Sequence, residues 1–293
     1  MIRKTRLSFV WVLFLAAFLS FRPAPAAEPV NEQLIPESRR VLDYLHSIYG
    51  NKTLAGQEER LRAEKAYQIC GLYPAIVSLD LASFTTYEGE RWTPEHRAVL
   101  QERIDHAKDW HRRGGIVTMQ WHWTNPLSSQ AHVRAIRPKF MAIDVGKVVT
   151  PGTDEHKAAM EDMKHHADYL AQLAEARVPV LFRPFHEIDG GWFWWSDVDE
   201  PENTAALWRM TYRYLVEERG LHNLIWVYSA ALKAGSKGKQ VEAIDYRKRF
   251  YPGDEFVDIS GIDIYINDWF GWPRYRESSY QKAYDIMRRG TPN

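Results

Sequence analysis

One stretch of the sequence predicts the fold most directly: Val178-Pro-Val-Leu-Phe-Arg-Pro-Phe-His-Glu-Ile-Asp-Gly-Gly-Trp-Phe-Trp-Trp195. Its first residues, Val178 to Phe182, form an apolar run that is too short for a helix and typical of a strand buried on both faces. The sequence then becomes polar at Arg183, His186 and Glu187, and the proline among them cannot donate to a neighbouring strand. We therefore expect a buried strand that ends near Arg183 and delivers an acidic side chain.

The residues after this acid are glycines and aromatic side chains. Gly190 and Gly191 allow a tight backbone, and three tryptophans follow within four residues. An acid at the end of a buried strand, beside aromatic rings, is the layout expected of a sugar-cleaving site on a barrel. The alternative is a buried ion pair between Arg183 and Glu187 beneath an aromatic cluster, with a structural role alone.

Outside this stretch, short apolar runs alternate with segments of helical periodicity. The expected strands cover residues 53–57, 74–80, 116–123, 178–182, 224–229 and 257–265, and the expected helices cover 36–49, 58–69, 93–113, 154–176, 201–219 and 278–289. This alternation indicates a parallel α/β fold. No glycine-rich phosphate loop follows the first strand, which makes a dinucleotide-binding fold less favoured. Polar and aromatic residues at most strand ends favour a barrel with its site on that face.

Composition narrows the class of partner. Lys and Arg number 38, Asp and Glu number 38, and no basic stripe occurs, so nucleic acid and anionic membranes are poor candidates. We expect a monomer. The chain has 12 tryptophans, and seven of them fall where strands are expected to end, as candidate platforms for sugar rings: Trp121, Trp123, Trp192, Trp194, Trp195, Trp269 and Trp272. Trp110, Trp208 and Trp226 lie in the bodies of expected elements, which is typical of core residues.

The N-terminus resembles an export signal. Arg3, Lys4 and Arg6 precede an apolar run, and Ala24-Pro25-Ala26 supplies a cleavage site. We therefore expect a signal peptide over residues 1–26, a catalytic barrel over residues 27–293, and a secreted or periplasmic protein. Cys70 is the one cysteine, so no intramolecular disulfide forms, and we expect a buried, inert thiol.

Three motifs together resemble glycoside hydrolase family 26, which is best known for endo-β-1,4-mannanases. They are Arg183-Pro-Phe-His-Glu187 followed by Gly191-Trp-Phe-Trp-Trp195, Gln120-Trp-His-Trp123 with Asn125-Pro126, and Gly261-Ile-Asp-Ile-Tyr265. The resemblance extends roughly from Leu54 to the C-terminus. It implies an α/β protein with a TIM (β/α)8 barrel, of which about six β/α units lie in this chain. It also implies a retaining mechanism on β-mannan or a related plant polysaccharide, with no cofactor and no metal.

The resemblance also implies roles for individual residues. Glu187 would be the acid/base, Arg183 would pair with a carboxylate, and His186 would support the site or contact substrate. The remaining substrate contacts would be His122, Trp192, Asp263 and Tyr265, with Tyr265 bonded to the nucleophile. From the residues alone, His122 is equally well explained as a core histidine, and Asp263 as the cap of a loop. Asp80, Glu88 and Glu90 are interpreted mostly as surface charges.

One part of the family pattern is missing. Retention requires a second carboxyl group about 5–5.5 Å from the first. The family places this nucleophile, a Glu, at the end of a seventh strand, whereas six strands are expected here and neither Glu255 nor Glu277 matches its position. We therefore expect a C-terminally truncated barrel that is inactive and poorly stable by itself, because its edge strands are unpaired.

Three alternatives stay open. A β-1,3-xylanase or a mixed-linkage β-glucanase would belong to the same family. A non-catalytic polysaccharide-binding protein would use the tryptophans without a nucleophile. A metal-dependent hydrolase would use His122, His186 and Glu187, although Gly190 stands where the helical zinc motif requires a second histidine.

Overall fold

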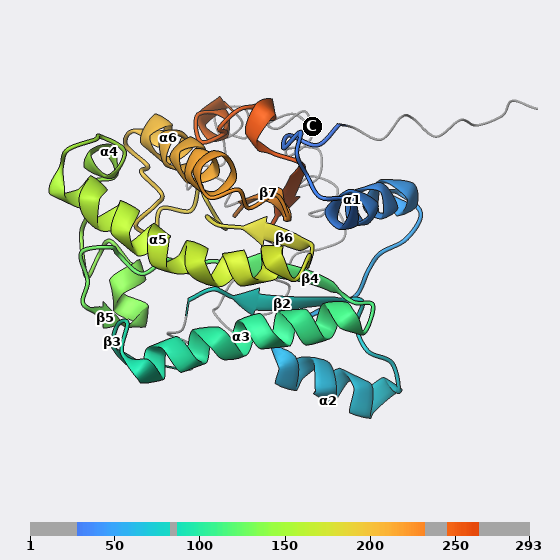
Figure 1. Cartoon of the computed structure of the whole chain (residues 1–293). Coiled ribbons are helices and arrows are strands. Elements are labelled where there is room, and N and C mark those ends of the chain that lie inside the picture. Colours follow the sequence, from blue (N-terminus) through green and yellow to red (C-terminus); the bar gives the residue numbers. More distant parts are fainter. Residues whose placement is uncertain (1–27, 83–86, 232–244, 264–293) are drawn as a thin grey trace, which may run out of the picture.

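The computed structural model describes residues 28–82, 87–231 and 245–263. Six strands form one parallel sheet in the order β1-β2-β4-β6-β7-β8 (Figure 1). Their bounds are β1 Gly56–Glu58, β2 Ile76–Asp80, β4 Ile116–Gln120, β6 Val180–Arg183, β7 Leu224–Ala230 and β8 Ile259–Ile262. The strand order follows the chain without reversal, unlike a doubly wound sheet. The predicted fold class, α/β and part of a TIM barrel, is confirmed.

One helix precedes the first strand, and the others lie in the connections between strands. The longer ones are α1 Pro36–Ile48, α2 Arg60–Cys70, α3 Pro94–Arg112, α5 Asp154–Glu175 and α6 Pro201–Tyr212, which continues as a π-helical segment, Arg213–Glu218. The hydroxyls of Thr93 and Thr153 accept from the backbone N–H of His96 and His156, and these caps fix where α3 and α5 begin. The two helices pack side by side along the sheet (Figure 1).

The long segment after β4, expected to be a loop, contains short elements. They are β5 Gln130–Ala131, a 3₁₀ turn at Val133–Ile136 and α4 Val145–Val148. Strand β5 pairs antiparallel with β3 Gly89–Glu90. A further 3₁₀ turn, Asp254–Phe256, lies between β7 and β8. Neither β3 nor β5 was expected, because two residues are too few to show a period. None of the described helices is both long and apolar enough to cross a bilayer.

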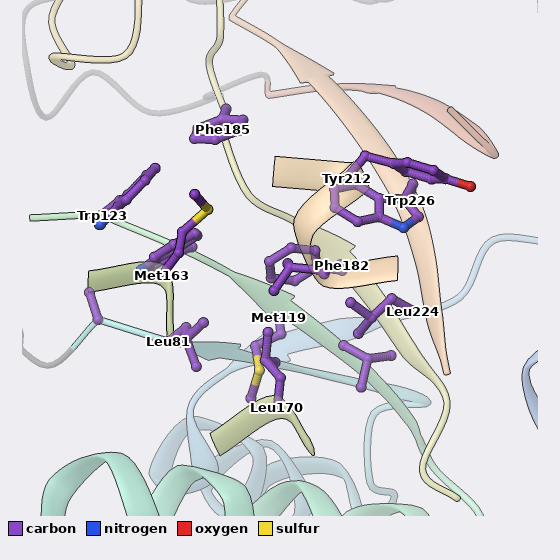
Figure 2. Close-up of a cluster of buried hydrophobic side chains, with 14 of the residues drawn as sticks. Leu81, Met119, Trp123, Met163, Leu170, Phe182, Phe185, Tyr212, Leu224 and Trp226 are labelled. Atoms are coloured by element: carbon purple, nitrogen blue, oxygen red, sulfur yellow. The ribbon is translucent and has the colours of Figure 1, made fainter. Parts of the chain in front are cut away.

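The core lies between the sheet and its helices. Figure 2 shows Met119, Phe182 and Trp226 from three neighbouring strands meeting Leu170 of α5 and Tyr212 of α6. Val180, Leu181 and Phe182 are all buried, as expected for a central parallel strand. Trp110, Trp208 and Trp226 are core residues, as predicted. This packing holds the carboxyl ends of the strands in fixed positions.

Four of the tryptophans expected to be sugar platforms are instead core residues. Trp121, Trp123, Trp194 and Trp195 are each 2% exposed or less. Trp121 and Trp123 stack at 4.3 Å, and the indole of Trp194 donates to the carbonyl of Trp123 at 2.6 Å. These rings are therefore packed in the core. Trp269 and Trp272 lie outside the described residues.

The prediction of a buried thiol is also wrong, because Cys70 is exposed. It is the last residue of α2, a helix that buries Ala63 alone among its residues. Leu61 and Ile69 of the same helix are more than three quarters exposed. The apolar end of α2 therefore faces solvent in the described structure, and the thiol with it.

Candidate active site

The six parallel strands bring the candidate residues to one edge of the sheet, where their carboxyl ends meet. Among the seven residues that the sequence predicts, six are described, and contacts join them in three groups. These are Glu187 with Trp192, His122 with His186, and Arg183 with Asp263. Tyr265, the seventh, lies outside the described residues.

Glu187 lies in the turn after β6 and is 7% exposed. Its φ of 52° is left-handed, a conformation that costs a residue other than glycine about 1–3 kcal/mol. Contacts with the end of β7 hold this turn: Ile188 donates to the carbonyl of Ser229 at 3.1 Å, and Ala231 donates to Asp189 at 2.7 Å. Asp189 also forms a buried ion pair with Arg247. The surrounding structure thus imposes the backbone conformation that presents the Glu187 carboxyl group.

Trp192 binds this carboxyl group directly. Its indole Nε1–H donates to Oε2 of Glu187 at 2.5 Å. The ring lies against Gly190, where a Cβ atom would come within 2.4 Å of it. Gly190 is therefore required for the indole to reach Glu187. The expected role of Trp192 as a sugar platform stays a prediction, and the structure adds a role as hydrogen-bond donor.

His122 belongs to a chain of three polar side chains. Its Nδ1 lies 2.6 Å from Oδ2 of Asp80, and its Nε2 lies 2.9 Å from Nε2 of His186. Asp80 is 3% exposed, so its interpretation as a surface charge is wrong. It ends β2 beside β4, and its carboxylate points along the shared edge toward His122. His122 is thus part of the polar site.

The environment favours an ionised Asp80 and a neutral His186. Burial opposes ionisation of Asp80, but the His122 ring and the backbone N–H groups of Ala82 and His122 outweigh it and lower its pKa. Burial, together with the nearby His122 and Arg183, holds the pKa of His186 well below 6.5. The site therefore contains a fixed negative charge that contacts an imidazole pair.

Arg183 pairs with a carboxylate, as predicted, and that carboxylate is Asp263. The two side chains form an ion pair at 2.5 Å, and Ser229 donates to the other oxygen of Asp263 at 2.7 Å. Arg183 also donates to Gln120 at 2.6 Å, and Gln120 donates to Glu58 at 3.1 Å. This belt of hydrogen bonds joins the ends of β1, β4, β6, β7 and the residue after β8.

Sequence reasoning missed Asp80, Gln120 and Ser229 as members of the site. Each lies at or next to the carboxyl end of a strand, so the rule that identified His122 and Arg183 also applies to them. No group of three or more His, Cys, Asp or Glu residues in the described ranges is arranged to hold a metal ion. The arrangement offers a carboxyl group for proton transfer, an imidazole pair and a fixed cation.

Comparison with known proteins gives a consistent result. The sequence profile of glycosyl hydrolase family 26 matches residues 30–280. A mannan endo-1,4-beta-mannosidase from Thermothelomyces thermophilus is 34% identical over 269 residues, which cover 87% of this chain and 51% of that protein. The chain therefore spans about half the length of that relative.

Solved structures agree. A GH26-CBM35 beta-(1,4)-mannanase from Podospora anserina has a TM-score of 0.70 at 28% identity, over 92% of this chain and 57% of that one. A beta-mannanase from a symbiotic protist of the termite Reticulitermes speratus, complexed with gluco-manno-oligosaccharide, has a TM-score of 0.73 at 28% identity, over 89% and 78%. With its parallel strands and strand-end residues, this chain belongs to glycosyl hydrolase family 26.

Proposed function

We propose that this chain belongs to a retaining endo-β-1,4-mannanase, with Glu187 as its acid/base. The observation that carries the proposal is the position of Glu187, at the end of β6 and bonded to Trp192, beside His186. In a retaining mechanism this group first protonates the leaving oxygen and then deprotonates the attacking water.

Mannan as substrate is supported by the relatives, which are named as mannan endo-1,4-beta-mannosidases. In the proposed site, His122, His186, Asp263 and Trp192 contact the sugar, and Arg183 orients Asp263. A preference for β-1,3-xylan or mixed-linkage β-glucan is the second candidate, because those polymers require the same acid/base chemistry. The protein acts as a monomer, without cofactor, nucleic acid or membrane as partner.

We place the second carboxylate outside the described residues. Asp80 and Asp263, the carboxylates nearest to the imidazole pair and to Arg183, are held by His122 and by Arg183 with Ser229. As the resemblance to the family implies, we propose a Glu at the end of a seventh strand as the nucleophile. Residues 27–293 by themselves are expected to be inactive on mannan, and normal turnover by this fragment would contradict the assignment.

The test of Glu187 compares hydrolysis of β-1,4-mannan, β-1,3-xylan and mixed-linkage β-glucan. The enzyme is the product of the whole reading frame, as wild type and as Glu187→Gln. Loss of acid/base catalysis lowers kcat on mannan by about 10²–10⁴-fold. Glu255→Gln, at an exposed position before β8, is the matched control and retains wild-type kcat. Binding of mannan without any hydrolysis by the wild type would instead support a polysaccharide-binding protein.

We also propose that the protein is secreted or periplasmic and that residues 1–26 are removed as a signal peptide. The basic residues, apolar run and Ala24-Pro25-Ala26 support this. Mass spectrometry of the protein exported by its host should give a mature N-terminus near Ala27. An intact N-terminus on the exported protein would contradict the cleavage.

A further inference from the structure

We propose that Asp80 is a positioning residue, which sets the tautomers of both His122 and His186 beside Glu187. The effect on catalysis rests on the proposed function of Glu187, whereas the tautomers themselves follow from hydrogen-bond geometry. Three contacts carry the inference, and each restricts where a proton can be.

The first restriction is at the carboxylate of Asp80. Its Oδ1 accepts from the backbone N–H of Ala82 at 3.0 Å and of His122 at 3.1 Å. Its Oδ2 lies 2.6 Å from Nδ1 of His122. An ionised carboxylate can only accept hydrogen bonds, so Nδ1 of His122 must carry the proton.

The second restriction is between the two rings. Nε2 of His122 and Nε2 of His186 are 2.9 Å apart, a distance that requires one hydrogen between them. With Nδ1 protonated, a neutral His122 has a bare Nε2 that accepts. His186 must then donate from its own Nε2, which leaves its Nδ1 bare. Among the described residues this buried Nδ1 has no hydrogen-bond partner.

The third restriction limits the proton count. Two Nε2–H groups cannot face each other at 2.9 Å, so both rings cannot be protonated together. Burial and the charge of Arg183 also favour a neutral His186. The ring of His186 is packed against Phe193 and Trp195. Asp80 therefore controls a hydrogen-bond chain that ends on the residue before Glu187.

Asp80→Asn tests this assignment with almost no change of shape. The amide oxygen of the new side chain can keep both backbone N–H donors of Ala82 and His122. Its NH₂ group then replaces Oδ2 and donates to Nδ1 of His122. His122 must move its proton to Nε2, and His186 must move its proton to Nδ1. Both tautomers are therefore reversed.

The measurement is a long-range ¹H–¹⁵N correlation spectrum of the full chain labelled in its histidines, because protonated and bare ring nitrogens resonate at well-separated frequencies. The wild type is expected to show His122 protonated at Nδ1 and His186 at Nε2, with the reverse in Asp80→Asn. The opposite tautomers in the wild type would overturn the proposal, even if Asp80→Asn did not fold. Unchanged tautomers in a folded Asp80→Asn would also overturn it.

The matched control is Asp258→Asn. Asp258 is another largely buried carboxylate that accepts from two backbone N–H groups, those of Val30 and Trp226, and it precedes β8 at the opposite end of the sheet. This variant tests whether the loss of any buried carboxylate changes the tautomers of His122 and His186. They should stay as in the wild type.

Activity separates this proposal from the proposed function. In the product of the whole reading frame, Asp80→Asn should lower kcat on mannan by about 10–100-fold, the effect measured for carboxylates that orient histidine ligands in metal sites. If the wild type hydrolyses no polysaccharide, the proposed function fails while the tautomer result stands. If the wild type is active and reversed tautomers leave kcat unchanged, the positioning role is overturned.

Discussion

At the residue scale, the site depends on one strained turn. Glu187 has a left-handed backbone, and Gly190 lies under the ring that binds its carboxyl group. Arg183 and Glu187 were indicated by their position at or after the end of a predicted strand, whereas His122 was identified through the resemblance to the family. Sequence reasoning missed Asp80, since an acid at the end of a strand has the same local sequence whether it is solvated or bonded to a histidine 42 residues away.

Gly190→Ala should displace Trp192 from Glu187. The added Cβ would lie 2.4–2.7 Å from three atoms of the indole, and such overpacking typically lowers the free energy of unfolding by about 1–3 kcal/mol. Denaturant unfolding followed by tryptophan fluorescence measures this change. The control is Gly56→Ala on β1, where the nearest atom is at 3.5 Å and the change should stay within about 0.5 kcal/mol. Equal stability of the two variants would show that the indole adapts freely.

At the scale of elements, α5 is fastened to β4 through Asp162. This buried side chain accepts from the indole of Trp123 at 2.5 Å and forms an ion pair with Arg91. The periodicity of α5 predicted its apolar face, and the helix bounds agree closely with those expected. The periodicity could not predict a buried carboxylate on that face. The cation that makes the burial of Asp162 possible, Arg91, comes from a segment 71 residues away.

Asp162→Asn should strongly destabilise the protein. It leaves Arg91 buried without its counter-ion, and breaking such a pair typically costs about 3–5 kcal/mol. Asp168→Asn on the same helix is the matched control, because Asp168 is 59% exposed in its ion pair with Arg219 and such pairs are worth about 0–1 kcal/mol. Urea unfolding of both variants gives the comparison. A loss of less than about 1 kcal/mol for Asp162→Asn would contradict a stabilising role of the pair.

At the scale of the whole molecule, buried histidines make stability depend on pH. Burial lowers the pKa of both His96 and His166 from 6.5 to about 4, with Arg91 acting in the same direction, and burial also holds the pKa of His186 well below 6.5. Between pH 6.5 and about 4 the unfolded chain binds protons that the folded chain does not. The free energy of unfolding therefore decreases as the pH falls through this window. Asp258, whose pKa burial raises, acts in the opposite direction above pH 3.8.

His166→Gln should remove part of this pH dependence. From pH 6.5 to 4, one such histidine contributes a decrease on the order of a few kcal/mol, because each unit of pKa shift is worth about 1.4 kcal/mol. The measurement is the free energy of unfolding in urea at several values of pH across this window. His46→Gln, at an exposed position on α1, should keep the wild-type slope. The same slope in His166→Gln as in the wild type would contradict the assignment.

The sequence by itself determined the alternation of strands and helices and the edge at which the site forms. Apolar runs alternate with helical segments, and parallel strands joined by helices must bring their carboxyl ends together. These are local patterns, so they can be recognised along the chain. The polar strand end that carries Arg183 and Glu187 is such a pattern, whereas the role of Glu187 as the acid/base came from the resemblance to the family.

Only the tertiary structure decided which residues of the same type have different roles. Trp192 binds Glu187 whereas Trp194 and Trp195 are core residues, and Arg183 pairs with Asp263 from 80 positions away. The direction of a side chain at a strand end depends on the packing of the segments above and below it. That packing brings together residues far apart in the chain, so it cannot be recognised from a local sequence pattern.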